Sequence, residues 1–417
     1  MNEKELLEQF KYKFSSIEQK LLDMAELAAQ NSSVKLYLVG GPVRDLLLGY
    51  ENHDLDFLIE GKIDLFIHEF NKITNSEPSN SSQFKTFKYK LYENEIDIAL
   101  ARTEIYPYSG SLPKITPSTI YEDLYRRDFT INALAIRLFP RPYKIIDPLN
   151  GFEQLKNKTI KIIHDKSFQD DPTRIFRALR YKSRLDFVID KTTHKAIKRD
   201  MQHINNISGR RITNALLKFL SEPDIFKSLF CLSEYKVLKV INRNFPSNIT
   251  FVQKLTKLNH MNNSIIDNEM LLLGILCFNM SESELQFVIS QFSIPKKISN
   301  ILFDLIKVKK KIYYSTLLKK PSSITKLFDN YEVKALKLAA NITDNVAFNN
   351  IVNKYIELWS RIKLNYDGAQ ISQLLSIDKS KLSAIISKVR DATIDGIVNG
   401  KSDEKNFILK LNKQLFK

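Results

Sequence analysis

The spacing of hydrophobic and polar residues changes once along the chain, near residue 147. Before that point short β-rich runs alternate with helical stretches, and four runs predict strands: Lys35–Val39, Asp54–Ile59, Phe84–Tyr92 and Glu95–Ala101. From Asp170 onward apolar residues recur every three to four positions, with breaks near Pro223, Pro246, Pro295 and Pro321. We therefore predict an α+β protein, with an N-terminal α/β part that contains a mixed β-sheet and an all-α C-terminal half.

Two glycines follow the first predicted strand and precede a short helix. Pro42 stands in the first turn of this helix, and Gly49 stands at its end. Gly40 and Gly41 let the backbone approach a triphosphate closely, while the helix start offers free N–H donors and Arg44 adds positive charge one turn later. Taken alone, the same pattern is also typical of a plain tight turn.

The next predicted strand carries two carboxylates at alternate positions, Asp54 and Asp56. Residues two apart on a strand point to the same face, so the two side chains should lie side by side. Like charges repel and lose hydration in an apolar strand unless a cation lies between them. Mg²⁺ prefers such oxygen ligands and commonly bridges carboxylates to substrate phosphates. We predict that Asp54 and Asp56 bind Mg²⁺, although a lone Asp-x-Asp is more often a solvated strand edge.

A third carboxylate candidate interrupts the strand Glu95–Ala101. Asp97 lies on the face opposite Ile96 and Ile98, and we take it, rather than Glu95, as the candidate. The alternative is a structural ion pair between Asp97 and Arg102 or Arg44.

These residues belong to a longer pattern. The string Gly40-Gly41-Pro-Val-Arg44-Asp45, followed by Asp54-Leu-Asp56, resembles the first motif of the class II tRNA nucleotidyltransferase and bacterial poly(A) polymerase family. Residues 126–135, Arg-Arg-Asp-Phe-Thr-Ile-Asn-Ala-Leu-Ala, closely resemble a second motif. Guanidinium groups suit phosphates, and carboxylate or amide groups suit ribose hydroxyls. The resemblance implies that Asp128 binds the ribose 2′-OH and that Arg127 lies near the phosphates, and Asn132 joins them as a nucleotide-binding candidate.

A third motif begins with two acids at a predicted helix start. Residues 170–174, Asp-Asp-Pro-Thr-Arg, resemble the family's Glu-Asp-x-x-Arg motif, whose Asp and Arg bind the Watson–Crick edges of CTP and ATP. The resemblance assigns that role to Asp171 and Arg174. Further arginines share one helix face with Arg174, so we add Arg177 to the base-selecting candidates and consider Arg180 and Asp170, which replaces the usual Glu. A basic stripe of this kind is otherwise an ordinary solvated helix face.

Two segments depart from the family pattern or carry little signal. Asn214 or Ala215 stands where the family has an acid that would brace the arginines. The segment from Thr103 to Glu122, which the family uses in the switch between bases, reads only as a Pro-rich flexible loop.

The resemblance also implies a division into four parts. We expect a catalytic nucleotidyltransferase head over residues 1–146 and a helical neck that selects the base over 147–221. A helical body should follow over 222–330, and an RNA-binding helical tail over 331–417. Lysines at 307 and 309–311, next to Tyr313 and Tyr314, suit RNA phosphates.

Composition agrees with a polyanionic partner. The net charge is +16, although part of this excess can reflect a Lys-rich and Asn-rich genome. Met270–Phe278, the longest apolar run, is far shorter than the roughly 20 residues that span a bilayer, which argues against a membrane protein. Cys231 and Cys277 have no partner at metal-ligand spacing, which fits a reduced cytoplasmic compartment.

The resulting hypothesis is template-independent transfer of C and A nucleotides to the 3′ end of tRNA, with CTP and ATP as substrates. An RNA 3′-OH would attack the α-phosphorus and pyrophosphate would leave, with Asp97 helping to deprotonate the hydroxyl. Three alternatives share these motifs: a poly(A) polymerase, an enzyme that adds only CC or only A, and an inactive RNA-binding relative. The sequence does not predict an oligomeric state.

Overall fold

The chain divides into two compact units, Met1–Arg243 and Asn244–Lys417, which we call unit 1 and unit 2. The computed structural model describes residues 10–50, 54–260, 266–375, 377 and 379–415. His53 and the other residues outside these ranges are not considered further. The boundary between the units falls inside the expected body, 222–330, and the four-part division of the chain stays a prediction.

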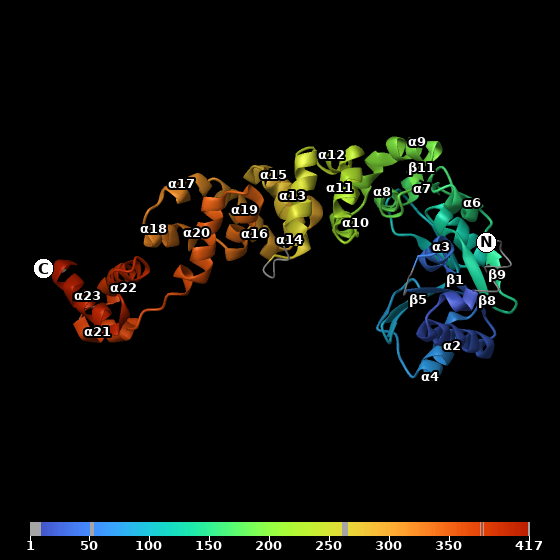
Figure 1. Ribbon diagram of the computed structural model, residues 1–417, viewed down its shortest axis with the longest axis horizontal. Coiled ribbons are helices and arrows are strands. Elements are labelled where there is room, and N and C mark those ends of the chain that lie inside the picture. The colour runs from blue at the N-terminus through green and yellow to red at the C-terminus, as the bar shows by residue number, and fades with distance from the viewer. Residues whose placement is uncertain (1–9, 51–53, 261–265, 376, 378, 416–417) are drawn as a thin grey trace. The chain divides into compact units, whose positions relative to one another are not determined.

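Unit 1 contains a seven-stranded mixed sheet with the strand order β3-β4-β5-β2-β1-β8-β9 (Figure 1). Strands β2 and β5 pair in parallel, whereas the other neighbours are antiparallel. The strands are β1 (Lys35–Val39), β2 (Leu55–Glu60), β3 (Asn80–Ser81), β4 (Thr86–Leu91), β5 (Asn94–Leu100), β8 (Ala135–Phe139) and β9 (Lys144–Ile146). The structure therefore confirms the mixed sheet and the four predicted strands, to within two residues at each end.

Alternation along these strands fixes which side chains enter the core. In β5, Ile96, Ile98 and Leu100 are buried, whereas Asp97 points to the opposite face. Helices α2 (Ser16–Ser32) and α4 (Ile63–Thr74) pack together, and their Leu21, Ala25, Phe66 and Phe70 are buried. A capping box between Ser15 and Glu18 stabilises the start of α2. The core thus holds β2 and β5 in one fixed register, which positions their aspartates.

The segment from Thr103 to Glu122 is not the irregular loop that the sequence suggested. Strands β6 (Arg102–Ile105) and β7 (Lys114–Pro117) form an antiparallel hairpin, and helix α5 (Ile120–Tyr125) follows. Arg102 and Arg126 both donate to the carboxylate of Glu104, at 2.8 Å and 2.9 Å. The prediction of a flexible loop was therefore wrong, because the segment pairs as a hairpin and Arg126, 22 residues further on, binds it through Glu104.

The rest of unit 1 is mainly helical. A short parallel pair, β10 (Thr159–Ile160) and β11 (Val188–Ile189), is its only sheet within the described residues after β9. The helices are α6 (Gly151–Lys156), α7 (Ser167–Asp170), α8 (Thr173–Leu185), α9 (Lys191–Asp200), α10 (Gly209–Leu220), α11 (Ile225–Glu234) and α12 (Val237–Ile241). Short 3₁₀ helices occur at η1 (Phe10–Lys13), η2 (Thr130–Asn132) and η3 (Met201–Asn206). Helix α8 packs against α10 and α11, which gives the arginines of α8 a firm support.

Unit 2 is all-helical over its described residues, as predicted. Its helices are α13 (Ile249–His260), α14 (Asn268–Cys277), α15 (Glu282–Phe292), α16 (Lys296–Lys309), α17 (Ile312–Leu317), α18 (Pro321–Phe328), α19 (Val333–Thr343), α20 (Val346–Glu357), η4 (Trp359–Arg361), α21 (Gly368–Leu375), α22 (Lys379–Ile394) and α23 (Gly400–Leu415). Helix α14 is buried on all sides, so its apolar run belongs to a protein core. No helix in the described part of the chain has the length and apolar content that a membrane crossing requires.

Candidate active site

A polar cavity of about 700 Å³ lies within unit 1, and most of the predicted site residues line it. Helix α3 (Gly41–Leu48), strand β2, the motif at 126–132 and helices α8 and α10 all contribute to its walls. The predicted residues brought together here are Gly40, Gly41, Arg44, Asp54, Asp56, Arg127, Asp128, Asn132, Asp171, Arg174, Arg177 and Arg180. Asp97 and Asp170 are not among the lining residues.

Because Gly40 has no side chain, Arg127 and Asp56 can lie close to the backbone at the start of α3. Its φ of +72° is strained for any residue with a side chain. A β-carbon at this position would lie 2.9 Å from Nη1 of Arg127 and 3.6 Å from Oδ2 of Asp56. No side chain caps α3, and its first residues face the cavity. The backbone N–H groups at this helix start therefore suit an anion, while phosphate binding by Gly40 and Gly41 stays a prediction.

Arg44 is buried and bound to protein groups. Its Nε and Nη2 donate to the two carboxylate oxygens of Asp45 at 2.8 Å and 2.9 Å, and its Nη1 donates to Oδ1 of Asn132 at 2.8 Å. The guanidinium also lies 5.2 Å from the ring centroid of Tyr181. Arg44 thus joins α3 to the second motif and to α8, while its direct contact with a phosphate stays a prediction.

The three predicted catalytic aspartates lie at one end of neighbouring strands. Asp56 of β2 is in register with Asp97 of β5, and Asp54 immediately precedes β2. Burial, followed by the charges of Asp97 and Asp54, raises the pKa of Asp56 to about 6, although Arg127 opposes this shift. Burial and the neighbouring carboxylates together therefore raise the pKa of Asp56 more than Arg127 and Lys88 lower it.

Asp97 has a partner that the sequence did not suggest. Lys88 of β4 donates to both carboxylate oxygens of Asp97, at 2.7 Å and 2.9 Å, rather than Arg102 or Arg44. Within the described residues, no group of three or more His, Cys, Asp or Glu side chains is arranged to hold a metal ion. Asp54 and Asp56 fit a cation that takes only one or two carboxylates from the protein and its other ligands from phosphates and water, as Mg²⁺ does.

A fully buried carboxylate orients the two arginines of the second motif. Asp123 of α5 accepts from Arg126 at 2.6 Å and from Arg127 at 3.1 Å. Arg127 also donates to the backbone oxygen of Asn132 at 3.2 Å. Asp123 therefore fixes Arg127 beside Gly40, where its guanidinium faces the cavity.

Hydrogen bonds connect the three motifs through Asp128. Arg177 of α8 donates to Oδ2 of Asp128 at 2.6 Å, and Asn132 donates to Oδ1 at 3.1 Å. Burial would raise the pKa of Asp128, but the charge and hydrogen bond of Arg177 outweigh it, so the pKa is lowered. Asp128 is therefore a carboxylate acceptor at neutral pH, as a contact with a ribose hydroxyl requires.

The predicted base-selecting residues lie around the start of α8. Asp171 accepts from Thr173 Oγ1 at 2.7 Å and from Arg211 of α10 at 2.9 Å. Arg174 is buried and donates to Ser167 Oγ at 2.8 Å and to the backbone oxygen of Arg126 at 2.7 Å. Both side chains are therefore held in fixed positions at the cavity wall. Asp170 instead lies 3.8 Å from His164, away from the cavity.

A different acid replaces the one missing at Asn214 or Ala215. Glu222 is buried, and Arg180 donates to it from Nε at 2.7 Å. The brace for the α8 arginines is thus shared by Glu222 and Asp128.

Several lining residues escaped the sequence analysis. Tyr181 follows Arg177 by four positions in α8, so helical spacing could have revealed it. Glu104 and Tyr106 lie in the hairpin that was read as a loop, and nothing local indicated them. Lys218 also lines the cavity, as does Arg184, which the helical spacing had already placed on one face with Arg174, Arg177 and Arg180.

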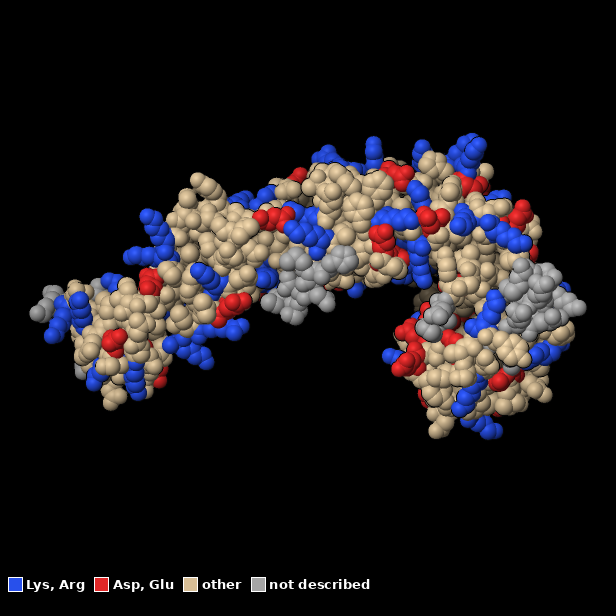
Figure 2. Space-filling model, viewed as in Figure 1, with Lys and Arg blue, Asp and Glu red and all other residues tan. Residues whose placement is uncertain are grey.

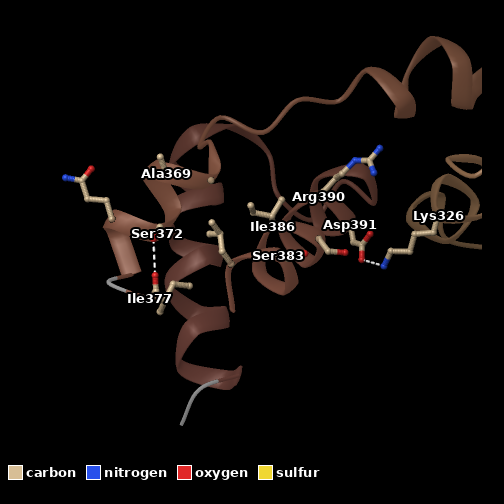
Figure 3. Close-up of a pocket in the computed structure, with 12 residues that line it drawn as sticks. Lys326, Ala369, Ser372, Ile377, Ser383, Ile386, Arg390 and Asp391 are labelled. Carbon is tan, nitrogen blue, oxygen red and sulfur yellow. Dashed lines mark hydrogen bonds and ion pairs between the residues drawn. The ribbon is translucent and has the colours of Figure 1, made fainter. Parts of the chain in front are cut away.

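A larger cavity, of about 1200 Å³, lies in unit 2 between α18, α21 and α22 (Figure 3). Its two cations are already neutralised, because Lys326 pairs with Asp391 and Arg390 pairs with Asp329. Serines and apolar side chains make up much of its remaining wall. It therefore lacks the uncompensated charge that marks the cavity in unit 1.

Comparison with known proteins agrees with these motifs. A family model described as "Poly A polymerase head domain" matches residues 36–161, and one described as "Probable RNA and SrmB- binding site of polymerase A" matches residues 186–247. The two matches lie in unit 1, apart from the last residues of the second.

The chain also aligns with curated tRNA nucleotidyltransferases. It is 36% identical over 225 residues to the A-adding tRNA nucleotidyltransferase of Aquifex aeolicus, which covers 53% of the chain but only 27% of that protein. It is 26% identical over 395 residues to the CCA-adding enzyme of Staphylococcus haemolyticus, which covers 91% of the chain and 93% of that protein.

The fold is similarly shared. A solved structure of a CCA-adding enzyme in an apo form superimposes with a TM-score of 0.80 at 24% identity, over 97% of the chain and 98% of that structure. In its motifs and in its two matched regions the chain is thus similar to the class II tRNA nucleotidyltransferase and bacterial poly(A) polymerase family, and it shares the fold of a solved CCA-adding enzyme.

Proposed function

We propose that the chain adds C and A nucleotides to the 3′ end of tRNA without a nucleic-acid template. One observation carries the proposal. A single cavity contains an anion-binding helix start at Gly40 and Gly41, the carboxylates Asp54 and Asp56, and the Asp171 and Arg174 pair. These groups are complementary to a triphosphate, a divalent cation and a nucleobase. An alignment over nearly the full length of a protein named CCA-adding enzyme supports it.

In this reaction an oxygen of the RNA 3′-OH forms a bond to the α-phosphorus of CTP or ATP. The bond between the α-phosphorus and the bridging oxygen breaks, pyrophosphate leaves, and the hydroxyl proton is released. Mg²⁺, held by Asp54 and Asp56 together with the phosphates, would neutralise the charge that develops on the phosphate oxygens. Gly40, Gly41 and Arg127 bind and orient the phosphates, and Arg44 supports them from behind.

Asp97 is the third catalytic candidate. It lies beside Asp56 in the sheet, and both its carboxylate oxygens accept hydrogen bonds from Lys88. We propose that Asp97 takes part in deprotonating the 3′-OH, and that its ion pair with Lys88 loosens when RNA is bound.

Base choice is assigned to Asp171 and Arg174. A carboxylate accepts from an exocyclic amino group, and a guanidinium donates to a ring nitrogen or carbonyl, so C and A fit. U and G would leave buried polar groups unpaired, which disfavours them. Asp128 and Asn132 bind the ribose, and Arg177 and Arg180 keep the neighbouring helix face in position. Asp170 is left with a structural role next to His164.

An A-adding activity is the second candidate function. The relative from Aquifex aeolicus that aligns over 225 residues carries that name. A poly(A) polymerase is the third, because the matching head-domain model is named for that activity.

Incubation with labelled CTP or ATP and Mg²⁺ separates these functions. The acceptors are one tRNA that ends at the discriminator base, one that ends at C and one that ends at CC. A CCA-adding enzyme extends all three, whereas an A-adding enzyme extends only the tRNA that ends at CC, and a poly(A) polymerase ignores CTP and adds many A residues. Absence of incorporation with every acceptor would contradict all three functions and indicate an inactive RNA-binding relative. A cytoplasmic location stays a prediction.

A further inference from the structure

The cations of the cavity in unit 1 divide into two groups. Most have a carboxylate partner: Arg44 pairs with Asp45, Arg126 and Arg127 with Asp123, Arg177 with Asp128, and Arg180 with Glu222. Arg174 instead donates to a serine hydroxyl and a backbone oxygen. Arg184 and Lys218 line the same cavity but form no ion pair or hydrogen bond with the described residues. Both side chains are exposed, so each is available to an external anion.

Arg184 and Lys218 lie at the same end of the cavity. Helices α8 and α10 are tied twice, once where Arg211 meets Asp171 and again near Glu222, which accepts from Arg180. Arg184 follows Arg174 by ten residues, about 15 Å along α8, and Lys218 follows Arg211 by seven residues, about 10 Å along α10. Both cations are therefore far from the base-selecting residues and close to Arg180. Figure 2 shows Lys and Arg side chains gathered beside these helices.

The surroundings of Lys218 favour an added negative charge. Desolvation and the charges of Arg180, Arg177 and Lys88 lower the pKa of Lys218. One of these charges, Lys88, also binds the carboxylate of Asp97. Exposed like charges without a counter-charge attract phosphates and focus the local field.

We infer that Arg184 and Lys218 bind the backbone phosphates of the last nucleotides of the RNA acceptor, and so bring its 3′ end to the catalytic carboxylates. This inference rests on the proposed function. In the proposed function, other residues bind the nucleotide substrate. Asp171 and Arg174 bind its base, and Gly40, Gly41, Arg127 and the metal-binding carboxylates hold its triphosphate. The two unpaired cations lie beyond that set. The triphosphate of the nucleotide is the other source of phosphate that Arg184 and Lys218 could bind. The experiment distinguishes it from the RNA backbone.

The test compares Arg184→Gln, Lys218→Gln and their double variant with a matched control, Lys195→Gln combined with Lys198→Gln. The control removes two exposed charges from α9 of the same unit, outside the cavity. KM values are measured for CTP and for a tRNA that lacks its CCA end. Binding of the same tRNA is followed by fluorescence anisotropy at several salt concentrations without nucleotide.

We expect the double variant to raise the KM for tRNA about tenfold and to leave the KM for CTP within about twofold. The slope of log K against log salt should fall by about 0.7 to 0.9 for each lost phosphate contact, and by less in the control. Arg184→Lys should restore part of the affinity, because a point charge can still bind a phosphate.

Other outcomes overturn the inference. A raised KM for CTP with an unchanged KM for tRNA would assign the two cations to the triphosphate. A double variant that behaves like the α9 control would show that neither source uses them. If the wild-type protein incorporates no nucleotide, the proposed function fails, while the salt dependence of tRNA binding still decides the role of the two cations.

Discussion

The missing side chain of Gly40 leaves room for two polar groups of the cavity. A β-carbon there would meet Arg127 and approach Asp56. Gly49, at the other end of α3, also has a positive φ, +75°, but its ψ is 22° where that of Gly40 is −129°, and nothing lies within 4 Å of its would-be β-carbon. The sequence suggested a close backbone approach at Gly40, yet it could not identify the two side chains that need the space.

Gly49 therefore serves as the control for a mutation at Gly40. Gly49→Ala should lose about 1–2 kcal/mol of folding free energy, because it forces alanine into the left-handed helical conformation, and Gly40→Ala should lose more, because almost only glycine adopts its combination of φ and ψ. Only Gly40→Ala should also lower kcat, by about 100-fold, since its β-carbon displaces Arg127. Thermal unfolding and nucleotide incorporation measure the two effects. Equal losses of activity in both variants would show that backbone strain alone is responsible.

Asp56 has a pKa near 6, and this value predicts an acidic limit of activity. Its carboxylate must be ionised to hold a cation, so activity should fall as the pH drops through about 6. A higher Mg²⁺ concentration should move this limit to lower pH, because the metal competes with the proton. Asp97→Asn removes the charge that repels the Asp56 carboxylate most. In the activity that this variant retains, the acidic limit should therefore lie about one pH unit lower than in the wild type.

The measurement is kcat/KM for CTP against pH at two Mg²⁺ concentrations. Glu95→Gln serves as the control, because Glu95 is exposed on the same strand and does not line the cavity. If the pH at which activity falls is the same at both Mg²⁺ concentrations, a group other than Asp56 controls the acidic limit. Full activity of Asp97→Asn at neutral pH would show that Asp97 does not take part in deprotonating the 3′-OH.

At the scale of elements, the hairpin β6–β7 is where sequence reasoning failed. Each strand has only four residues, and prolines interrupt the segment, so local propensity favoured a loop. Its stability comes from distant residues. Gly110 packs against Asn206 so closely that a β-carbon would lie 2.9 Å from the backbone oxygen of Asn206, and Arg211 donates to the oxygen of Gly110 at 2.7 Å. Strong alternation made the central strands predictable, whereas these tertiary ties leave no local pattern.

Arg211 links three elements and should therefore affect base choice. Its guanidinium binds the hairpin tip and Asp171 at the same time. Arg211→Gln frees Asp171 to move, so we expect discrimination of CTP against UTP to fall about tenfold, with a smaller change in the KM for tRNA. Arg210→Gln, which removes an exposed charge from the neighbouring position, is the control. The ratio of kcat/KM for CTP to that for UTP is measured in each variant. An unchanged ratio in Arg211→Gln would show that the contact of Arg211 with the hairpin does not affect base choice.

At the scale of the whole molecule, the change from β-rich to helical spacing correctly predicted the order of the two fold types. The division at Arg243 and Asn244 was not predictable in the same way, because helical periodicity continues across it. Motif spacing located most of the cavity because most of its lining residues fall within the motifs. Asp123, Glu222 and Lys88 support them from positions that no motif marks, and only the fold brings them into place.

The division into units predicts the behaviour of a truncated protein. All residues that line the nucleotide cavity lie in unit 1, together with their partners Asp123 and Glu222 and a core that includes Phe57, Phe176 and Phe219. A protein that ends at Arg243 should therefore fold and bind CTP within about threefold of the full-length affinity, a difference below 1 kcal/mol. It should bind tRNA far more weakly, by about 100-fold, because it loses the lysines at 307 and 309–311 and the other cations of unit 2. Calorimetry with CTP and anisotropy with tRNA test both parts. Loss of CTP binding in a folded truncated protein would show that the nucleotide site needs unit 2, and undiminished tRNA binding would confine the RNA surface to unit 1.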